Sequence, residues 1–147
     1  MKRYATAQKD IPKPTMAKFV LNGRVKSKKN SKEIAKRPNG QMFVRSSDSF
    51  KAWENTARYE LLKQKIELQN QGWVFPFEGR LRLELRFEMI GLKHEPDVSN
   101  LIEGPQDLLQ ELDIIKNDKH IVEVHAVKFM DQPADITFMT LSKSLEV

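Results

Sequence analysis

The sequence predicts one α+β (mixed α/β) domain in which a small mixed β-sheet packs against two main helices. Apolar and charged residues alternate along 80–90, which predicts a half-buried strand. Apolar residues recur at spacings of three and four along 50–61, which predicts one face of an amphipathic helix. Strand and helix patterns mix without regular βαβ repetition, and 147 residues fit one domain.

The chain is expected to open with a flexible basic tail at 1–16, followed by one domain at 17–147. The tail segment is polar and contains Pro12 and Pro14. A strand is predicted within 18–25, before a turn at Asn22-Gly23. The next segment, 27–32, has no apolar residue and is expected to form a basic loop.

A short hairpin is expected next, because Pro38-Asn39-Gly40 separates two apolar stretches. The long helix should begin at one of the N-cap types that follow it and end near 70–72. Its buried face and its capping candidates are Phe50, Trp53, Ala57 and Leu61, and Ser46, Ser47 and Asp48.

Aromatic residues cluster at 73–77, after the helix. They are expected to cover the core, and the alternative is that they stack on DNA bases. The strand at 80–90 carries charges of both signs on its outer face, which favours a solvated face over DNA contact. A second helix is predicted over 98–112, capped by Asp97 or Ser99, and two more strands over 121–129 and 136–141.

Charge is distributed unevenly along the chain. Residues 1–45 have a balance of +11 and residues 46–147 a balance of −6, for a net charge of +5. A strongly basic first third favours a polyanion, nucleic acid above all, as the partner, and the alternative is a solvated basic tail. The sequence has no cysteine, which excludes disulfides and thiolate chemistry. No apolar run predicts a signal peptide or a membrane helix.

Acidic residues gather between 93 and 121. Asp97 precedes a predicted helix and Asp118 precedes a predicted strand, so the two carboxylates are expected to converge at one sheet edge. Such oxygen ligands suit Mg²⁺ or Mn²⁺, which could activate water and stabilise charge on a phosphate. The alternative is that these acids are ordinary solvated residues near helix and strand ends.

The same segment resembles the RusA family of Holliday-junction resolvases, which are common in phages and prophages. The family's acidic motif and a second motif about a dozen residues later match without a gap, and an upstream strand and loop at 23–30 agree. The residues in register are Asp97, Asn100, Leu101, Asp107, Asp118 and Ile121.

Three positions depart from the family pattern. Ser99 and Asn117 replace acids, and Glu103 replaces a lysine. Residues 99 and 103 would be i,i+4 neighbours on one helix, so the acid gained at 103 could replace the one lost at 99. Gly104-Pro105 is expected to kink that helix.

The resemblance implies a Mg²⁺- or Mn²⁺-dependent, structure-specific endodeoxyribonuclease that resolves Holliday junctions or other branched DNA in recombination and repair. It implies a homodimer acting in the cytoplasm of a bacterial or phage-infected cell. The sequence offers two candidate interfaces, the aromatic stretch near Trp73, Phe75 and Phe77 or helix faces not needed for the core. The expected catalytic residues are Asp97, Asp118 and Glu103, and Asp107 is added as a metal ligand. The expected DNA contacts are Lys28, Lys29, Asn30, Lys32, Lys36, Arg37, Lys93 and His94.

Two other functions stay open from the sequence. One is a junction-binding protein of the same fold with weakened or lost catalysis. The other is a phage accessory protein whose basic tail binds a protein partner.

Overall fold

A computed structural model describes residues 15–28 and 32–145. It confirms the α+β class, with a four-stranded mixed sheet, a separate two-stranded hairpin and two α-helices. The predicted tail lies outside the described residues except for its end, where Met16 opens the first strand. The elements are β1 (Met16–Asn22), β2 (Lys32–Lys36), β3 (Met42–Ser46), α2 (Asp48–Asn70), β4 (Leu81–Glu88), η1 (Val98–Leu101), α3 (Glu103–Glu111), η2 (Asp118–His120), β5 (Ile121–Phe129) and β6 (Ile136–Lys143).

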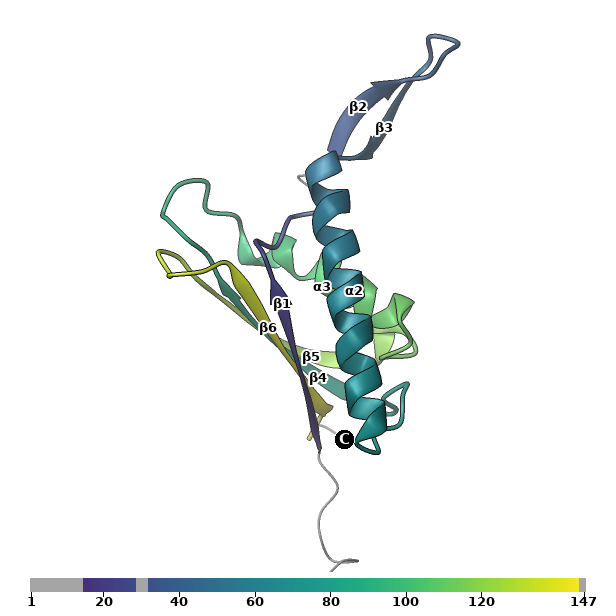
Figure 1. Ribbon diagram of the computed structural model, residues 1–147, viewed down its shortest axis with the longest axis vertical. Helices are drawn as coiled ribbons and strands as arrows, with labels where there is room; N and C mark the ends of the chain where they lie inside the picture. The colour runs from purple at the N-terminus through teal and green to yellow at the C-terminus, as the bar shows by residue number, and fades with distance from the viewer. Residues whose placement is uncertain (1–14, 29–31, 146–147) are drawn as a thin grey trace, which may run out of the picture.

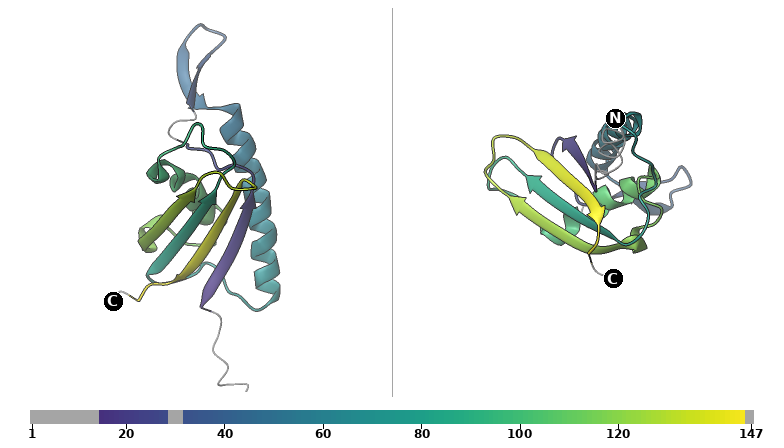
Figure 2. Two further views of the ribbon diagram at one scale, coloured as in Figure 1. Left: turned by 90° about the vertical axis from the view of Figure 1, so that its left-hand side faces the viewer. Right: turned by 90° about the horizontal axis from the view of Figure 1, so that it is seen from below.

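The main sheet has the order β1-β6-β4-β5, and among the described residues the helices cover only one of its faces (Figures 1 and 2). Neighbouring strands are antiparallel except β4 and β5, which are parallel. Both helices pack against the same face, where the alternating apolar residues of β4 are buried. The opposite face is open, as expected of a sheet whose strands alternate in polarity.

Helix α2 forms as the sequence predicts. Ser47 is its N-cap, and the Ser47 hydroxyl accepts a hydrogen bond from the Phe50 backbone N–H at 3.2 Å. The buried face consists of the four predicted residues, Phe50, Trp53, Ala57 and Leu61.

The aromatic segment after α2 closes the core, as predicted. Phe77 is buried, and Trp73 and Phe75 pack against the core with their rings stacked 6.2 Å apart. Trp73 also lies 5.8 Å from Phe77. These rings therefore have packing partners within the chain.

Side chains of α2 occupy the free edge of β1. The Val20 N–H donates to Gln64 Oε1 at 2.8 Å, and Gln64 Nε2 donates to the Val20 carbonyl at 2.7 Å. Farther along, the Asn22 N–H donates to Glu60 at 2.8 Å. The helix thereby supplies hydrogen-bond partners to backbone groups that would have none in a bare edge strand.

The predicted 98–112 helix is divided into two elements, which corrects one expectation. The turn η1 has Asp97 rather than Ser99 as its N-cap, and α3 starts only at Glu103. Pro105 is therefore the third residue of α3, within the first turn, where its missing N–H costs little. The kink expected from Pro105 is wrong because the helix begins later than the sequence pattern indicates.

The hairpin β2–β3 projects beyond the N-terminal end of α2, away from the sheet (Figures 1 and 2). Its strands pair antiparallel from Lys32–Ser46 to Lys36–Met42 around the predicted turn. Because β3 ends directly before the N-cap of α2, the hairpin is attached at the first turn of that helix.

Candidate nuclease site

The segment that carries Lys93 and His94 links β4 to η1 and is tied to β5. Lys128 Nζ donates to the Pro96 carbonyl at 2.8 Å and lies 3.1 Å from the Glu95 carboxylate. Lys93 and His94 are both exposed. The two residues are thus presented to solvent by a segment that has a fixed attachment.

Asp97 and Asp118 do not meet at one sheet edge. Asp97 follows Pro96, which lies against Lys128 near the C-terminal end of β5. Asp118 lies in η2, directly before the N-terminal end of β5, and its backbone N–H donates to Gln110 Oε1 at 3.0 Å. Because β4 and β5 are parallel, their C-terminal ends lie at the same end of the sheet. The chain leaves β4 at that end and enters β5 at the opposite end.

Both carboxylates are nevertheless available for a ligand. Asp97 is exposed and makes no side-chain cap hydrogen bond in η1. Asp118 is also exposed, and the contact described above engages its backbone rather than its carboxylate.

Glu103 and Asp107 lie four residues apart on α3, so they share a face of that helix. Lys28, in the loop before the hairpin, bonds Asp107 Oδ2 at 3.0 Å. This hydrogen bond, and the charges of Asp107, Glu103 and Glu54, raise the pKa of Lys28 above its ordinary value of 10.5, although burial opposes the change. Lys28 therefore balances an acidic surface within the chain.

This acidic surface borders a cavity of about 280 Å³ between α2 and α3. Arg58 of α2 bonds Glu111 of α3 at 2.8 Å and also pairs with Glu54 at 3.3 Å. The Glu111 hydrogen bond is the main cause that raises the pKa of Arg58. The cavity lining consists of Lys28, Glu54, Asp107, Leu108, Gln110 and Glu111.

The expected metal ligands do not form one cluster. Within residues 15–28 and 32–145, no group of three or more His, Asp or Glu side chains has an arrangement that could hold a metal ion. Asp107 forms an ion pair with Lys28, whereas Asp97 and Asp118 lie near opposite ends of β5. The donor chemistry suits Mg²⁺, but the described residues provide at most a partial coordination shell.

The expected DNA contacts other than Lys93 and His94 fall on the hairpin and on the residues just before it. Lys32, Lys36 and Arg37 are exposed on the hairpin, with the Arg37 guanidinium 4.8 Å from the Phe43 ring centroid. Lys29 and Asn30 lie outside the described residues.

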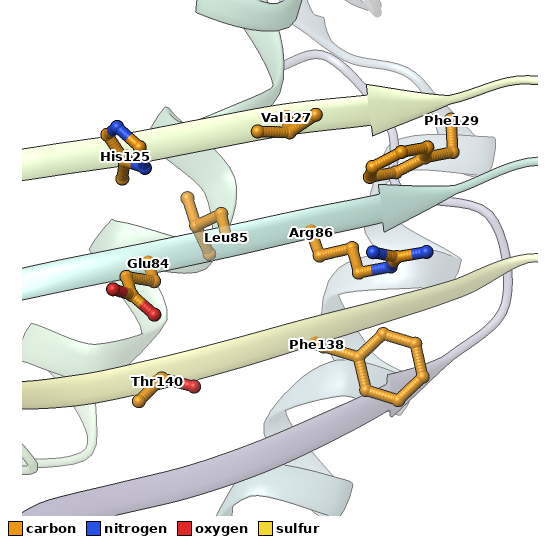
Figure 3. A pocket seen from close by; sticks show the side chains of 8 residues that line it. All are labelled: Glu84, Leu85, Arg86, His125, Val127, Phe129, Phe138 and Thr140. Atoms are coloured by element: carbon orange, nitrogen blue, oxygen red, sulfur yellow. The ribbon is translucent and has the colours of Figure 1, made fainter.

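A second hollow, of about 320 Å³, lies on the open face of the sheet (Figure 3). Arg86 extends beside Phe129, with its guanidinium 3.9 Å from the ring centroid, and Phe138 lies on its other side. Arg86 also pairs with Glu88 at 2.9 Å, and Arg82 pairs with Glu84 at 2.9 Å. These arginines are balanced by carboxylates, so this face does not have the charge of a phosphate-binding surface.

Comparison with protein families shows that residues 22–139 match the family described as endodeoxyribonuclease RusA. The match covers most of the chain. The chain belongs to the RusA endodeoxyribonuclease family. Among curated proteins, none matches the chain.

The RusA match extends from the end of β1 into β6, so it includes the hairpin, both α-helices and all four expected metal ligands. The family binds branched DNA junctions. Across the described residues, no helix has both the length and the apolar character needed to cross a bilayer.

Two of the departures from the RusA pattern lie on different sides of the break in the predicted helix. Ser99 lies in η1 and Glu103 in α3, so the two residues are not i,i+4 neighbours on one α-helix. The partner of Glu103 at that spacing is Asp107.

Several residues that hold the site together were missed by the sequence analysis. Lys128 fixes the segment before Asp97, and Gln110 fixes the backbone at Asp118. Arg58 links α2 to α3. Their contacts span between 8 and 53 positions of sequence, so no local pattern indicates them.

Proposed function

We propose that this chain is a divalent-metal-dependent, structure-specific endodeoxyribonuclease that nicks four-way DNA junctions in recombination and repair. The observation that carries the proposal is the RusA family match over residues 22–139. The basic hairpin supports it, because exposed Lys and Arg side chains supply the phosphate contacts on which most DNA affinity rests.

The proposed ion is Mg²⁺ or Mn²⁺. Mg²⁺ in nucleases is commonly held by one or two carboxylates, with water and substrate phosphate completing the shell. Asp97 and Asp118 are the proposed primary ligands, each of a separate ion, because both carboxylates are exposed and the two residues lie near opposite ends of β5; Glu103 assists from α3. Asp107 would contribute only after releasing Lys28. When bound, such an ion supplies an activated water and stabilises charge on the phosphate.

The chain's own residues have separate roles in this proposal. Lys93 and His94 bind phosphate beside Asp97, because they lie on the same tethered segment. The exposed hairpin cations Lys32, Lys36 and Arg37 hold the DNA farther out, joined by Lys29 and Asn30, which precede them in the sequence. Lys28 positions α3 through Asp107 rather than binding phosphate while the pair is intact.

We also propose that the protein acts as a homodimer in the cytoplasm of a bacterial or phage-infected cell. A four-way junction offers two symmetry-related strands, and a twofold dimer presents two equivalent sites to them. The open face of the sheet is the proposed interface, because it exposes Val127 and Phe138 and alternates acids with bases. A surface of that kind can be self-complementary.

The test is a cleavage assay on a labelled synthetic four-way junction, with a linear duplex of matched sequence as control. With Mg²⁺ or Mn²⁺, we expect paired nicks in the junction and no cleavage of the duplex. With EDTA, we expect binding without nicks. Equal cleavage of both DNAs would contradict structure specificity, and cleavage in EDTA would contradict metal dependence.

The second candidate is a junction-binding protein with no cleavage activity. The observation that favours it is the loss of acids at Ser99 and Asn117, together with the separation of Asp97 from Asp118. Junction binding without nicks in either metal would support this candidate. Failure to bind any branched DNA would leave the third sequence-based function, an accessory protein that binds a protein partner.

A further inference from the structure

One face of the hairpin β2–β3 exposes apolar side chains that do not pack against the core of the described chain. Ile34 pairs directly with Val44, and Met42 lies diagonally beside them. Their exposed fractions are 71%, 66% and 59% respectively. None of the three belongs to the core or packs against it.

The opposite face of the hairpin is held by its own contacts. Glu33 and Arg45 are directly opposite each other and form an ion pair at 2.9 Å. Arg37 lies over the Phe43 ring. Because side chains alternate between the faces of a strand, the apolar residues lie on the side away from these contacts and add nothing to them.

Charge on the apolar face indicates which partner it fits. Lys32 and Lys36 lie on this face because they are two residues before and after Ile34. They are about 13 Å apart along the strand, at 3.3 Å per residue. The only acid in the hairpin, Glu33, is on the other face and is paired with Arg45. A partner must therefore present negative charge on both sides of an apolar surface.

DNA has this combination, because phosphates border the flat apolar faces of the bases. Two-stranded β-ribbons fit DNA grooves, and proteins that bend DNA insert Ile, Met or similar side chains between base steps. A branch point favours such insertion, since stacking is already interrupted there. The hairpin of a second copy fits less well, because it offers no unpaired acid to meet Lys32 and Lys36.

We infer that β2–β3 is a base-contacting arm: Ile34, Met42 and Val44 pack against bases at the DNA branch point, while Lys32 and Lys36 contact the flanking phosphates. The inference rests on the proposed action on branched DNA and adds a contact to the bases themselves. The attachment of the arm agrees with it. Lys28, four residues before β2, is bonded to Asp107 on α3, so the root of the arm lies beside the acidic surface of the site.

The test compares two variants of the full chain that differ in the kind of contact removed. Ile34→Thr with Val44→Thr keeps β-branched side chains in both strands and removes apolar surface. Lys32→Gln with Lys36→Gln removes charge from the same face. Ala35→Ser, next to Ile34 but on the opposite face, is the matched control. Circular dichroism and sedimentation of each variant check folding and oligomeric state.

Binding is measured in EDTA, on a four-way junction and on a linear duplex, over a range of salt concentrations. The threonine variant should bind the junction about tenfold more weakly, the order of one lost base contact, with the salt slope and the duplex affinity unchanged. The glutamine variant should reduce the log–log salt slope by about 0.9 per lost phosphate contact on both DNAs. The serine control should match the wild type.

A 2-aminopurine base at the branch point gives the direct readout. Wild-type protein should raise the 2-aminopurine fluorescence by unstacking this base. The threonine variant should not raise it, even at a concentration that saturates the junction. Equal weakening on junction and duplex, or an unchanged 2-aminopurine signal, would overturn the inference. A shift of the threonine variant to a smaller oligomer would also overturn it and assign the face to contact between copies.

These results separate failure of the inference from failure of the proposed function. If the threonine variant binds and nicks the junction as the wild type does, the arm is not a base contact, but the nuclease proposal stands. If wild-type protein does not bind the junction at all, both fail together.

Discussion

Gly104 lies where α3 packs against Trp53 of α2. A Cβ at this position would be 2.9 Å from Trp53 Cζ3, closer than real contacts allow. The residue is therefore required for the close approach of the two helices rather than for an unusual backbone conformation. The sequence shows Gly104 only as a helix breaker, because the ring that excludes its side chain is 51 positions away.

We expect Gly104→Ala to lower the free energy of unfolding by about 1–3 kcal/mol, because α3 or the Trp53 ring must move. Urea unfolding measures the change. Trp53→Phe removes the part of the ring that approaches position 104, so the alanine should cost less in that background. Equal costs in both backgrounds would show that the contact with Trp53 is not the cause.

The Lys28–Asp107 pair predicts a dependence of stability on alkaline pH. The pKa of Lys28 is higher in the folded chain than in the unfolded chain. Its contribution is therefore complete below pH 10.5 and is lost as the pH rises through the folded-state pKa. Both side chains are about 40% exposed, so the pair should contribute less than about 1 kcal/mol.

Unfolding of the wild type and of Lys28→Met should thus differ by a small, constant free energy between pH 7 and 10. The difference should shrink above that range, as Lys28 loses its charge. A difference that stays constant through the titration would mean that packing of the Lys28 stem, and not its charge, is responsible.

Asp97→Asn should abolish junction cleavage and leave folding and DNA binding nearly unchanged. The substitution removes one negative charge from an exposed ligand and keeps the shape of the side chain. Asp113→Asn is a matched control, since Asp113 is exposed, has a φ of 53° that asparagine tolerates, and is outside the proposed ligand set. Cleavage by Asp97→Asn at the wild-type rate would exclude Asp97 as a ligand.

At the scale of elements, the sequence predicts most of the chain order, because periodicity depends only on neighbouring residues. It predicts α2 with its cap and buried face, β4 with its alternation, and the hairpin with its turn. It does not predict that β4 and β5 are parallel, since strand direction depends on how the α3 connection crosses the sheet. The expected meeting of Asp97 with Asp118 is wrong for this reason.

The segment between β4 and η1 gives a prediction for an element without regular structure. Lys128→Met removes the hydrogen bond to Pro96 and the ion pair with Glu95 and keeps most of the side chain's length. Hydrogen exchange of peptides covering 90–97 should become faster, with the core strands unchanged. Junction cleavage should fall severalfold, because Asp97 is then held less firmly.

The counterpart measurement is Lys119→Met, at an exposed lysine of η2, near the end of β5 opposite to this segment. It should leave exchange over 90–97 and cleavage as in the wild type. If both lysine variants reduce cleavage equally, the loss comes from reduced positive charge and not from release of the segment.

At the scale of the whole molecule, one face of the sheet is covered by helices and the other is open (Figure 2). If the open face is the dimer interface, sedimentation at micromolar concentration should give a mass near twice 17.1 kDa. Phe138→Arg should produce monomers, because it adds a charge beside Arg86 in the open-face hollow. Tyr59→Arg, at an exposed position on α2, should leave the dimer intact.

A monomeric wild type that stays monomeric on added junction DNA would contradict the dimer. A dimer that survives Phe138→Arg would place the interface on another surface.

The hydrogen bonds between β1 and the side chains of Gln64 and Glu60 also affect the tendency of the protein to aggregate at high concentration. A bare edge strand is a template on which strands of other molecules can grow, and sheets extended in this way become fibres. Here the backbone N–H groups of Val20 and Asn22 already donate hydrogen bonds to α2 side chains of the same molecule. The side chains of α2 therefore block the pairing of other strands with this edge. Substitution of Gln64 would expose the edge to aggregation while the chain is still folded.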